Sequence, residues 1–172
     1  MDQHIGRAEL LARLARSYQR VIATLAPLTP AQLGTPGVVG DWSIKDVLAH
    51  FIAHEQFALA ELDHARRGQR YEPGMADLDT INARAVAERQ GKPAIAVLRD
   101  WQASYQQVVA AVQALPEADF DPAGPLAQAL GDTIDGALGN NSYEHYAEHL
   151  PAIEAWLRAL GSNESPGRVD GC

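Results

Sequence analysis

Residues 133–160, TIDGALGNNSYEHYAEHLPAIEAWLRAL, predict the last of four long helices. At about 100° per residue, one stripe of this segment carries side chains three and four positions apart. The stripe consists of Ile134, Leu138, Ser142, His145, His149, Ile153, Trp156 and Leu160. Two histidines therefore interrupt an otherwise mainly apolar face. Because Pro151 removes one backbone hydrogen bond inside the segment, we expect a kink just after His149.

Apolar residues recur with the same helical period in the rest of the chain, over 8–26, 44–67, 77–90 and 94–115. Ser43 and Asp46 resemble a capping box, which marks the start of the second long helix clearly. The last two runs are expected to form one third arm, broken at Gly91. Strand-type alternation is absent from the sequence. Four helical arms with loops of moderate length predict an all-α fold, an up-down four-helix bundle.

The length of 172 residues and the hydrophobic content of 47% suit one domain with a continuous core. We assign the domain to 1–160, expect 121–131 to form a loop, and expect a disordered tail over 161–172, which is rich in Ser, Gly, Pro and charge. The single cysteine, Cys172, excludes an intramolecular disulfide framework.

The formal net charge of −8 disfavours nonspecific binding to the phosphate backbone, so nucleic acid is not an expected partner. The sequence contains no apolar stretch of the ~20 residues that span a bilayer, and its first residues do not resemble a secretion signal. These features predict a soluble cytoplasmic protein without a membrane partner.

Four of the six histidines form two His-x-x-x-His pairs, His50 with His54 and His145 with His149. Side chains four apart lie on the same side of a helix, so each pair can share one metal ion. A buried polar group without a partner costs ~1–3 kcal/mol. The histidines at 145 and 149 therefore need either a metal or a compensating network of hydrogen bonds.

The sequence leaves several roles open around these pairs. Helical periodicity places His54 slightly nearer than His50 to the centre of the apolar face, and packing must decide which of them points inward. Nearby carboxylates are candidate ligands, partners of ligands or bases, although most are expected to be solvated; they are Glu55, Glu144 and Glu148. Candidates to line a pocket are Trp42, Asn141, Tyr143 and Tyr146.

The segment 40–50, Gly-Asp-Trp-Ser-Ile-Lys-Asp-Val-Leu-Ala-His, resembles the second-helix signature of the DinB-like superfamily. This superfamily includes the N-terminal domain of mycothiol-dependent maleylpyruvate isomerase. The spacing of His145 and His149 is similar to that of the last-helix ligands of the superfamily, and the resemblance extends over 5–160. In the isomerase branch a carboxylate replaces the first of these two histidines, so His145 fits the general pattern better than that branch.

The resemblance implies a DinB-like four-helix bundle that binds a divalent metal, commonly zinc or nickel. It implies His50, His145 and His149 as ligands, which favours His50 over His54 in the second helix. His54 then becomes a residue that contacts the ligands or faces the substrate. We group it with Asn141 and Glu148 as candidates for such supporting roles.

Three nitrogen ligands around zinc leave one position for water or substrate, as in catalytic sites. We therefore expect a metal-dependent enzyme acting on a small electrophilic molecule, either a hydrolase or an S-transferase or isomerase that uses a low-molecular-weight thiol. The alternative is a non-catalytic protein of the same fold that binds small molecules or confers self-resistance. No catalytic residue beyond the metal ligands is assigned, and pairing through exposed helix faces predicts a homodimer.

Overall fold

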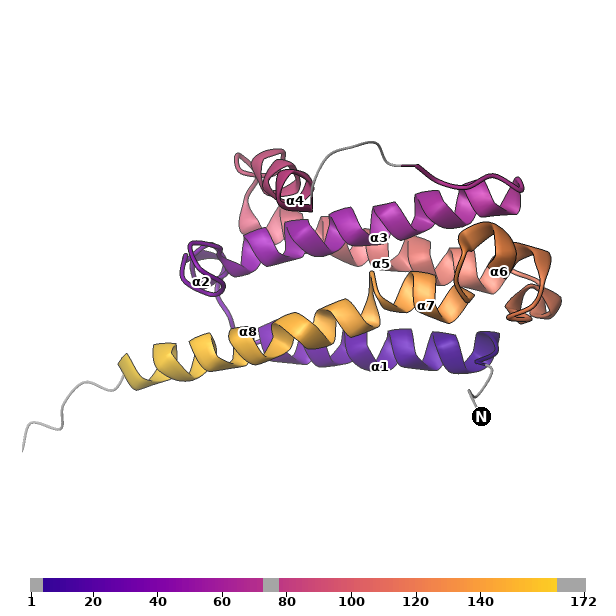
Figure 1. The fold of residues 1–172 in the computed structure, drawn as a ribbon. Coiled ribbons are helices and arrows are strands. Elements are labelled where there is room, and N and C mark those ends of the chain that lie inside the picture. Colours follow the sequence, from indigo (N-terminus) through magenta and orange to yellow (C-terminus); the bar gives the residue numbers. More distant parts are fainter. Residues whose placement is uncertain (1–4, 73–77, 164–172) are drawn as a thin grey trace, which may run out of the picture.

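The computed structural model describes residues 5–72 and 78–163, and this part of the chain is all-helical. Its long helices are α1 (Arg7–Leu25), α3 (Ile44–Arg66), α5 (Ala94–Ala114) and α8 (Tyr143–Asn163) (Figure 1). Shorter elements are α2 (Pro30–Leu33), α4 (Leu78–Ala87), the 3-10 helix η1 (Glu117–Phe120), α6 (Pro125–Leu130) and α7 (Ile134–Gly139). Within the described residues, β-structure is limited to one isolated bridge between Val39 and Trp42. The predicted all-α class is confirmed.

The four long helices pack in a ring, because α1 contacts α5 and α8 while α3 contacts the same two helices. Figure 1 shows α1 and α8 lying side by side. Ser17 Oγ donates to the carbonyl of Tyr143 at 3.1 Å, and Arg20 binds Glu154 further along both helices. The start of α8 therefore lies beside the middle of α1, and the contacts advance along both helices together, so these two helices run in the same direction.

Helices α3 and α5 also run in the same direction. Lys45 Nζ donates to the carbonyl of Gln90 at 2.9 Å just before α5, whereas Gln56 Nε2 donates to Ser104 Oγ and to Gln107 Oε1 in its middle. The arrangement differs from the expected alternating up-down order at this point. The connection 67–93 is long enough to bring the chain back to the first end of α3 before α5 begins.

Helix α4 lies across the outside of α3 and does not extend α5. It contacts α3 extensively, and Figure 1 shows it nearly end-on where α5 is seen from the side. The expectation of one broken arm over 77–90 and 94–115 is therefore wrong, since only α5 belongs to the set of long helices. The turn over 88–93, which includes Gly91 and Pro93, changes the direction of the chain.

The predicted helix over 133–160 is interrupted at 140–142, between α7 and α8. Asn141 Nδ2 donates to the carbonyl of Ala137 at 3.0 Å, and the Ser142 hydroxyl donates to the carbonyl of Leu138. Such side-chain bonds compete with the helical ladder for the same carbonyl groups. A helical period continues on both sides of the interruption, which is why the sequence pattern does not reveal it.

The C-terminal end of α8 also differs from expectation. The helix continues through Pro151 and reaches Asn163, beyond the predicted end at 160. The remainder of the predicted tail, 164–172, lies outside the described residues.

Helix α6 forms inside the predicted loop 121–131, where Pro125 occupies a first-turn position and Gly131, with φ of 75°, ends the helix.

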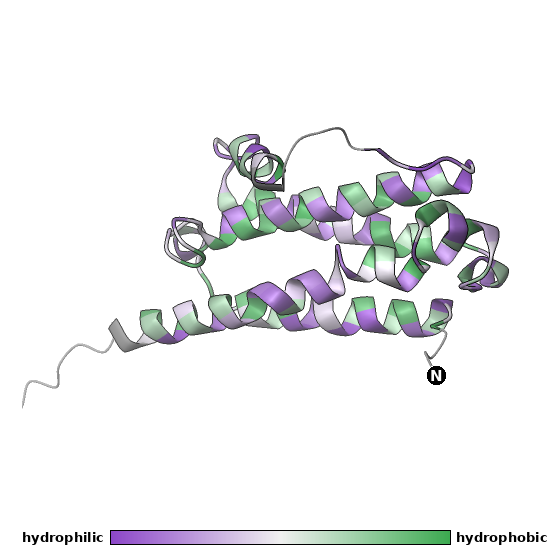
Figure 2. Cartoon of the chain, viewed as in Figure 1, coloured by the Kyte–Doolittle hydropathy of each residue, from purple (hydrophilic) through white to green (hydrophobic). Residues whose placement is uncertain are grey.

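The interior consists of two clusters of apolar side chains along the ring of long helices. One surrounds Phe51, Trp101 and Tyr146, and the other surrounds Leu14 and Val108. Figure 2 shows a hydrophilic stretch in the first half of α8, followed by more hydrophobic turns. The helices of the described residues include none with the length and apolarity needed to cross a bilayer.

Candidate metal centre

The histidine site forms where the first half of α3 faces the first turns of α8, which run antiparallel to it. A capping box between Ser43 and Asp46 fixes the start of α3. His50 and His145 are 4% and 8% exposed, and His149 is half-buried. One nitrogen from each of these three rings lies within 4.8 Å of the other two. Two helices thus bring together three residues that could hold one metal ion.

The rings of His50 and His145 are held in their neutral form. Burial is the main cause that lowers the pKa of His50 to about 4 and that of His145 to about 3, and repulsion from neighbouring imidazoles adds to it. Burial also lowers the pKa of His149. Neutral imidazole nitrogen is the form that ligates metals, so no proton has to be displaced at pH 7.

The closest approach in the site joins Nε2 of His50 to Nε2 of His145, at 2.6 Å. Two neutral rings in this position either share one proton or direct both lone pairs at the same point. A cation at that point removes the repulsion between the lone pairs. The donor set is therefore suited to a divalent ion of the zinc and nickel type, for which imidazole is a common ligand.

The outer nitrogens of the same rings lie near polar side chains of the kind that orient ligating histidines. Nδ1 of His145 lies 3.6 Å from Oε2 of Glu148, whose side chain is largely exposed. Nδ1 of His50 and Oδ1 of Asn82 are both buried without an ordinary hydrogen-bond partner among the described residues. The Asn82 side chain is nevertheless close enough to oppose the depression of the His50 pKa by hydrogen bonding.

Asn82 is the site residue that the sequence did not indicate. It belongs to α4, and an asparagine inside a helical run carries no signal of its own. Only the position of α4 across α3 brings it to His50.

His54 packs against the three-histidine cluster and does not belong to it. Its ring stacks on that of His145 with centroids 4.1 Å apart, and its Nδ1 lies 3.1 Å from Oδ1 of Asn141. The bond from Asn141 Nδ2 to Ala137 fixes the orientation of the amide. His54 therefore donates through Nδ1, which leaves the lone pair on its Nε2 free to accept a proton or a hydrogen bond.

A small cavity opens beside His54 and Asn141. Its volume is about 60 Å³, and its lining is mostly apolar, with Ala53, Phe57 and Ile81 as the remaining walls. A water molecule needs ~10–15 Å³ measured in this way, so a few waters or a small chemical group fit. Two of the three predicted supporting residues thus face a cavity next to the histidines.

The aromatic candidates divide between the site and the core. The Trp42 ring lies 5.3 Å from that of His50, held there by the tight turn at Gly40, whose φ of 56° suits glycine. Tyr143 instead donates to Asp135 Oδ1 at 2.7 Å, away from the histidines. Tyr146 is fully buried in the core. The sequence pattern did not separate these cases, because all three residues lie close to a histidine along the chain.

Glu55 is the exception among the three nearby carboxylates, most of which were expected to be solvated, since Glu144 and Glu148 are exposed. Its side chain is 0% exposed, and burial raises its pKa to about 8. The Tyr146 hydroxyl donates to Oε1 of Glu55 and accepts from Trp101 Nε1 at 3.3 Å. Glu55 is therefore a protonated core residue at pH 7.

The unfolding free energy of the metal-free protein is expected to be highest near pH 6.5. The folded-state pKa values of His50 and His145 lie below the ordinary 6.5, so unfolded chains bind more protons and stability is lost as pH falls from 6.5 towards 4. Glu55 acts in the opposite direction: its folded-state pKa lies above the ordinary 4.5, so stability is lost as pH rises towards 8.

Urea denaturation of chelator-treated protein across this pH range measures the effect. Between pH 6.5 and 8 we expect a decline on the order of 2 kcal/mol, which Glu55→Gln abolishes. An unchanged decline in that variant would assign it to another group.

Comparison with known proteins places this geometry in context. The family model described as the mycothiol maleylpyruvate isomerase N-terminal domain matches residues 14–137. A search of curated proteins and a search of solved structures found no match. The matched range includes α3 with His50 and ends before α8, so it is shorter than the 5–160 expected from the sequence. The placement of His145 and His149 therefore rests on the geometry alone.

Proposed function

Because the chain belongs to the mycothiol maleylpyruvate isomerase N-terminal domain family, within the DinB-like superfamily, we propose that it is a metal-dependent enzyme acting on a small electrophilic molecule. The observation that carries this proposal is the convergence of one nitrogen each from His50, His145 and His149 within 4.8 Å. We assign these three as the ligands and zinc or nickel as the metal. We also infer that the four long helices form a bundle of the DinB-like type.

The proposed ligands supply three nitrogens, and a divalent ion held by three nitrogens keeps an open position and supplies Lewis acidity to a water or thiol there. His54 packs against the rings of His50 and His145 with the lone pair of Nε2 available, held in this tautomer by Asn141. We assign to His54 the acceptance of the proton that the water or thiol releases. The apolar walls of Phe57 and Ile81 limit the access of bulk water.

Thiol-dependent transfer or isomerisation is the preferred reaction class, and hydrolysis is the second. The preference rests on the mycothiol in the description of the family. A non-catalytic binding role is supported by one observation: the 2.6 Å contact between His50 and His145 also fits two histidines that share a hydrogen bond without an ion. In that role the cavity beside His54 would hold the small molecule by itself.

Cobalt substitution separates the three roles. We expect purified protein to bind one equivalent of Co²⁺ and to show thiolate-to-cobalt charge-transfer absorption when 2-mercaptoethanol is added. The matched control is 2-(methylthio)ethanol, which cannot form a thiolate and should leave the spectrum unchanged. Cobalt binding without the absorption would favour hydrolysis, and failure to bind cobalt, zinc or nickel would overturn the enzyme proposal.

A further inference from the structure

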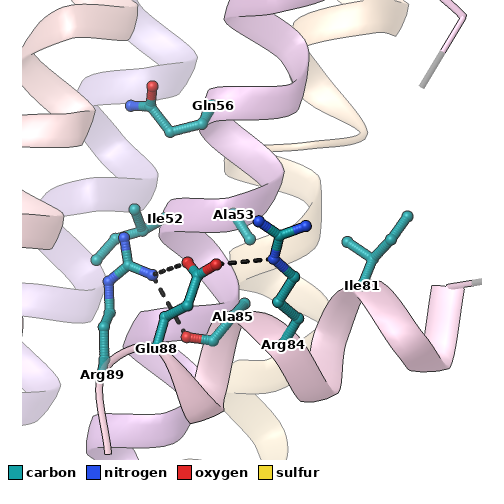
Figure 3. Close-up of a pocket in the computed structure, with 8 residues that line it drawn as sticks. All are labelled: Ile52, Ala53, Gln56, Ile81, Arg84, Ala85, Glu88 and Arg89. Atoms are coloured by element: carbon teal, nitrogen blue, oxygen red, sulfur yellow. Dashed lines mark hydrogen bonds and ion pairs between the residues drawn. The ribbon is translucent and has the colours of Figure 1, made fainter. Parts of the chain in front are cut away.

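A second hollow lies between α3 and α4 (Figure 3), and it shares Ala53 and Ile81 with the small cavity beside His54. At about 100° per residue, Ile52 and Gln56 point roughly 180° and 140° away from the mean direction of the histidine pair of α3. The hollow is lined by Ile52, Ala53 and Gln56 of α3 and by Ile81, Arg84, Ala85, Glu88 and Arg89 of α4 and the turn after it. Its volume is about 320 Å³, at the lower end of the ~300–1,000 Å³ typical of small-molecule sites.

The hollow has an apolar floor and a charged rim. Ile52, Ala53 and Ile81 supply apolar surface, and the two arginines point towards the Glu88 carboxylate between them. Arg84 Nε lies 2.8 Å from Oε1 of Glu88, and Arg89 Nη1 lies 3.9 Å from Oε2. Two guanidinium groups and one carboxylate leave one positive charge on this rim, although the chain as a whole carries a net charge of −8.

Arg89 is the residue whose bonding is incomplete. Its side chain is 21% exposed, and its Nη1 donates to the carbonyl of Ala85 at 3.3 Å. Its Nε is buried and has no hydrogen-bond partner among the described residues. A third hollow also borders the Arg89 side chain, and its other walls are Ile52, Gln56, Asp100, Ala103, Ser104 and Gln107. The Nε–H lies on the edge of the guanidinium away from Nη1 and Glu88, so a ligand in place of Glu88 would contact the Nη groups.

We propose that this hollow binds a small carboxylate with an apolar body. The carboxylate replaces that of Glu88 between Arg84 and Arg89, where planar guanidinium groups favour such oxygens. The Glu88 side chain is 53% exposed, so it can move into water at little cost. The apolar body covers Ile52, Ala53 and Ile81. None of these residues is a proposed metal ligand, and the inference holds whether or not the metal proposal does.

The test is a titration of the full chain with 4-phenylbutyrate, followed by calorimetry or by ligand NMR, in the presence of a chelator. Each of the variants Arg84→Gln and Arg89→Gln removes the charge-assisted bond from one arginine to the ligand carboxylate. Each is therefore expected to weaken binding about tenfold. Glu88→Gln is expected to tighten it several-fold, because the competing internal carboxylate is removed. The amide 4-phenylbutyramide should bind far more weakly than the acid.

The matched control is Arg99→Gln, which removes the same charge at an exposed position of α5 outside the hollow. If Arg99→Gln and Arg89→Gln weaken 4-phenylbutyrate binding equally, long-range electrostatic attraction alone explains the effect, and the proposed site is overturned. Weaker binding by Glu88→Gln, with an unchanged melting temperature, would overturn the proposed replacement of Glu88. Because the probe contains no thiol and the buffer contains a chelator, neither outcome depends on the metal centre.

Discussion

Replacing His145 by alanine is expected to lower the affinity of the chain for Zn²⁺ or Ni²⁺ by more than about 100-fold. Even the residues that only orient metal ligands are worth about 10–100-fold in affinity, and His145 is itself a proposed ligand. Its Nε2 lies 2.6 Å from that of His50, so the two rings are directed at the same point. The two histidines that remain come from different helices and cannot complete the set.

Metal content after dialysis and the metal-induced rise in melting temperature both measure this loss. An ion bound only by the folded state, at 1,000 times its Kd, stabilises that state by about 4 kcal/mol, and the His145→Ala variant should show almost none of this rise. Comparing the rise rather than the melting temperature separates metal binding from any cavity left by the substitution. The control is His64→Ala in the last turn of α3, where the ring bonds to the carbonyl of Ala60 and lies outside the three-histidine cluster. A full rise in the His145 variant would exclude the proposed site.

Tyr146→Phe is expected to lower the unfolding free energy by about 2–4 kcal/mol, since each buried polar group left without a partner costs ~1–3 kcal/mol. The substitution removes one hydroxyl, so Oε1 of Glu55 loses the bond from Tyr146 and Nε1 of Trp101 loses the acceptor that this hydroxyl supplied. Both groups lie where no solvent reaches them. The shape of the ring is unchanged, so the loss reports the hydrogen bonds rather than packing.

Denaturant unfolding at pH 6.5 measures this loss. Tyr71→Phe is the control, because Tyr71 is half-buried and its ring contacts only Phe57 and His64 among the described aromatic residues. Adding Glu55→Leu to Tyr146→Phe should recover part of the loss, since the variant then no longer buries a carboxyl group. Equal effects of the two tyrosine substitutions would show that the Glu55 contact contributes nothing.

Helical periodicity predicted most of the features that are set within a single helix, namely its position in the sequence and the face on which each residue lies. It identified the long helices, and it placed His145 and His149 on the stripe of α8 that faces the interior. Periodicity slightly favoured His54 as the inward residue of α3, but His50 is the one in the cluster, as the resemblance implied. Neighbouring helices decide this point: Trp42 and α8 enclose His50, whereas Asn141 holds His54 at the edge.

Helical periodicity could not predict the features that depend on contacts between two or more elements. Charge and spacing made Glu55 resemble a solvated carboxylate, because its burial requires Tyr146 from another helix and Trp101 from a third. The parallel course of α3 and α5 follows from the path of a long connection, which local propensities do not describe. Asn82 and the Arg84–Arg89 hollow both depend on where α4 lies on α3. The expected homodimer stays a prediction.

The interruption at 140–142 separates the rotational phase of α8 from that of α7. In one continuous helix, every residue of 134–163 would share a single angular register, and a shift in α7 would turn the histidines with it. Here the joint resets that register, with Asn141 bound both to the end of α7 and to His54. A residue added to one continuous helix would turn the histidine pair by about 100°, whereas a residue added within α7 need not turn α8 across the joint. The direction in which the histidine pair of α8 points therefore depends on the joint and on the contacts of α8, and not on the helical phase of the segment before it.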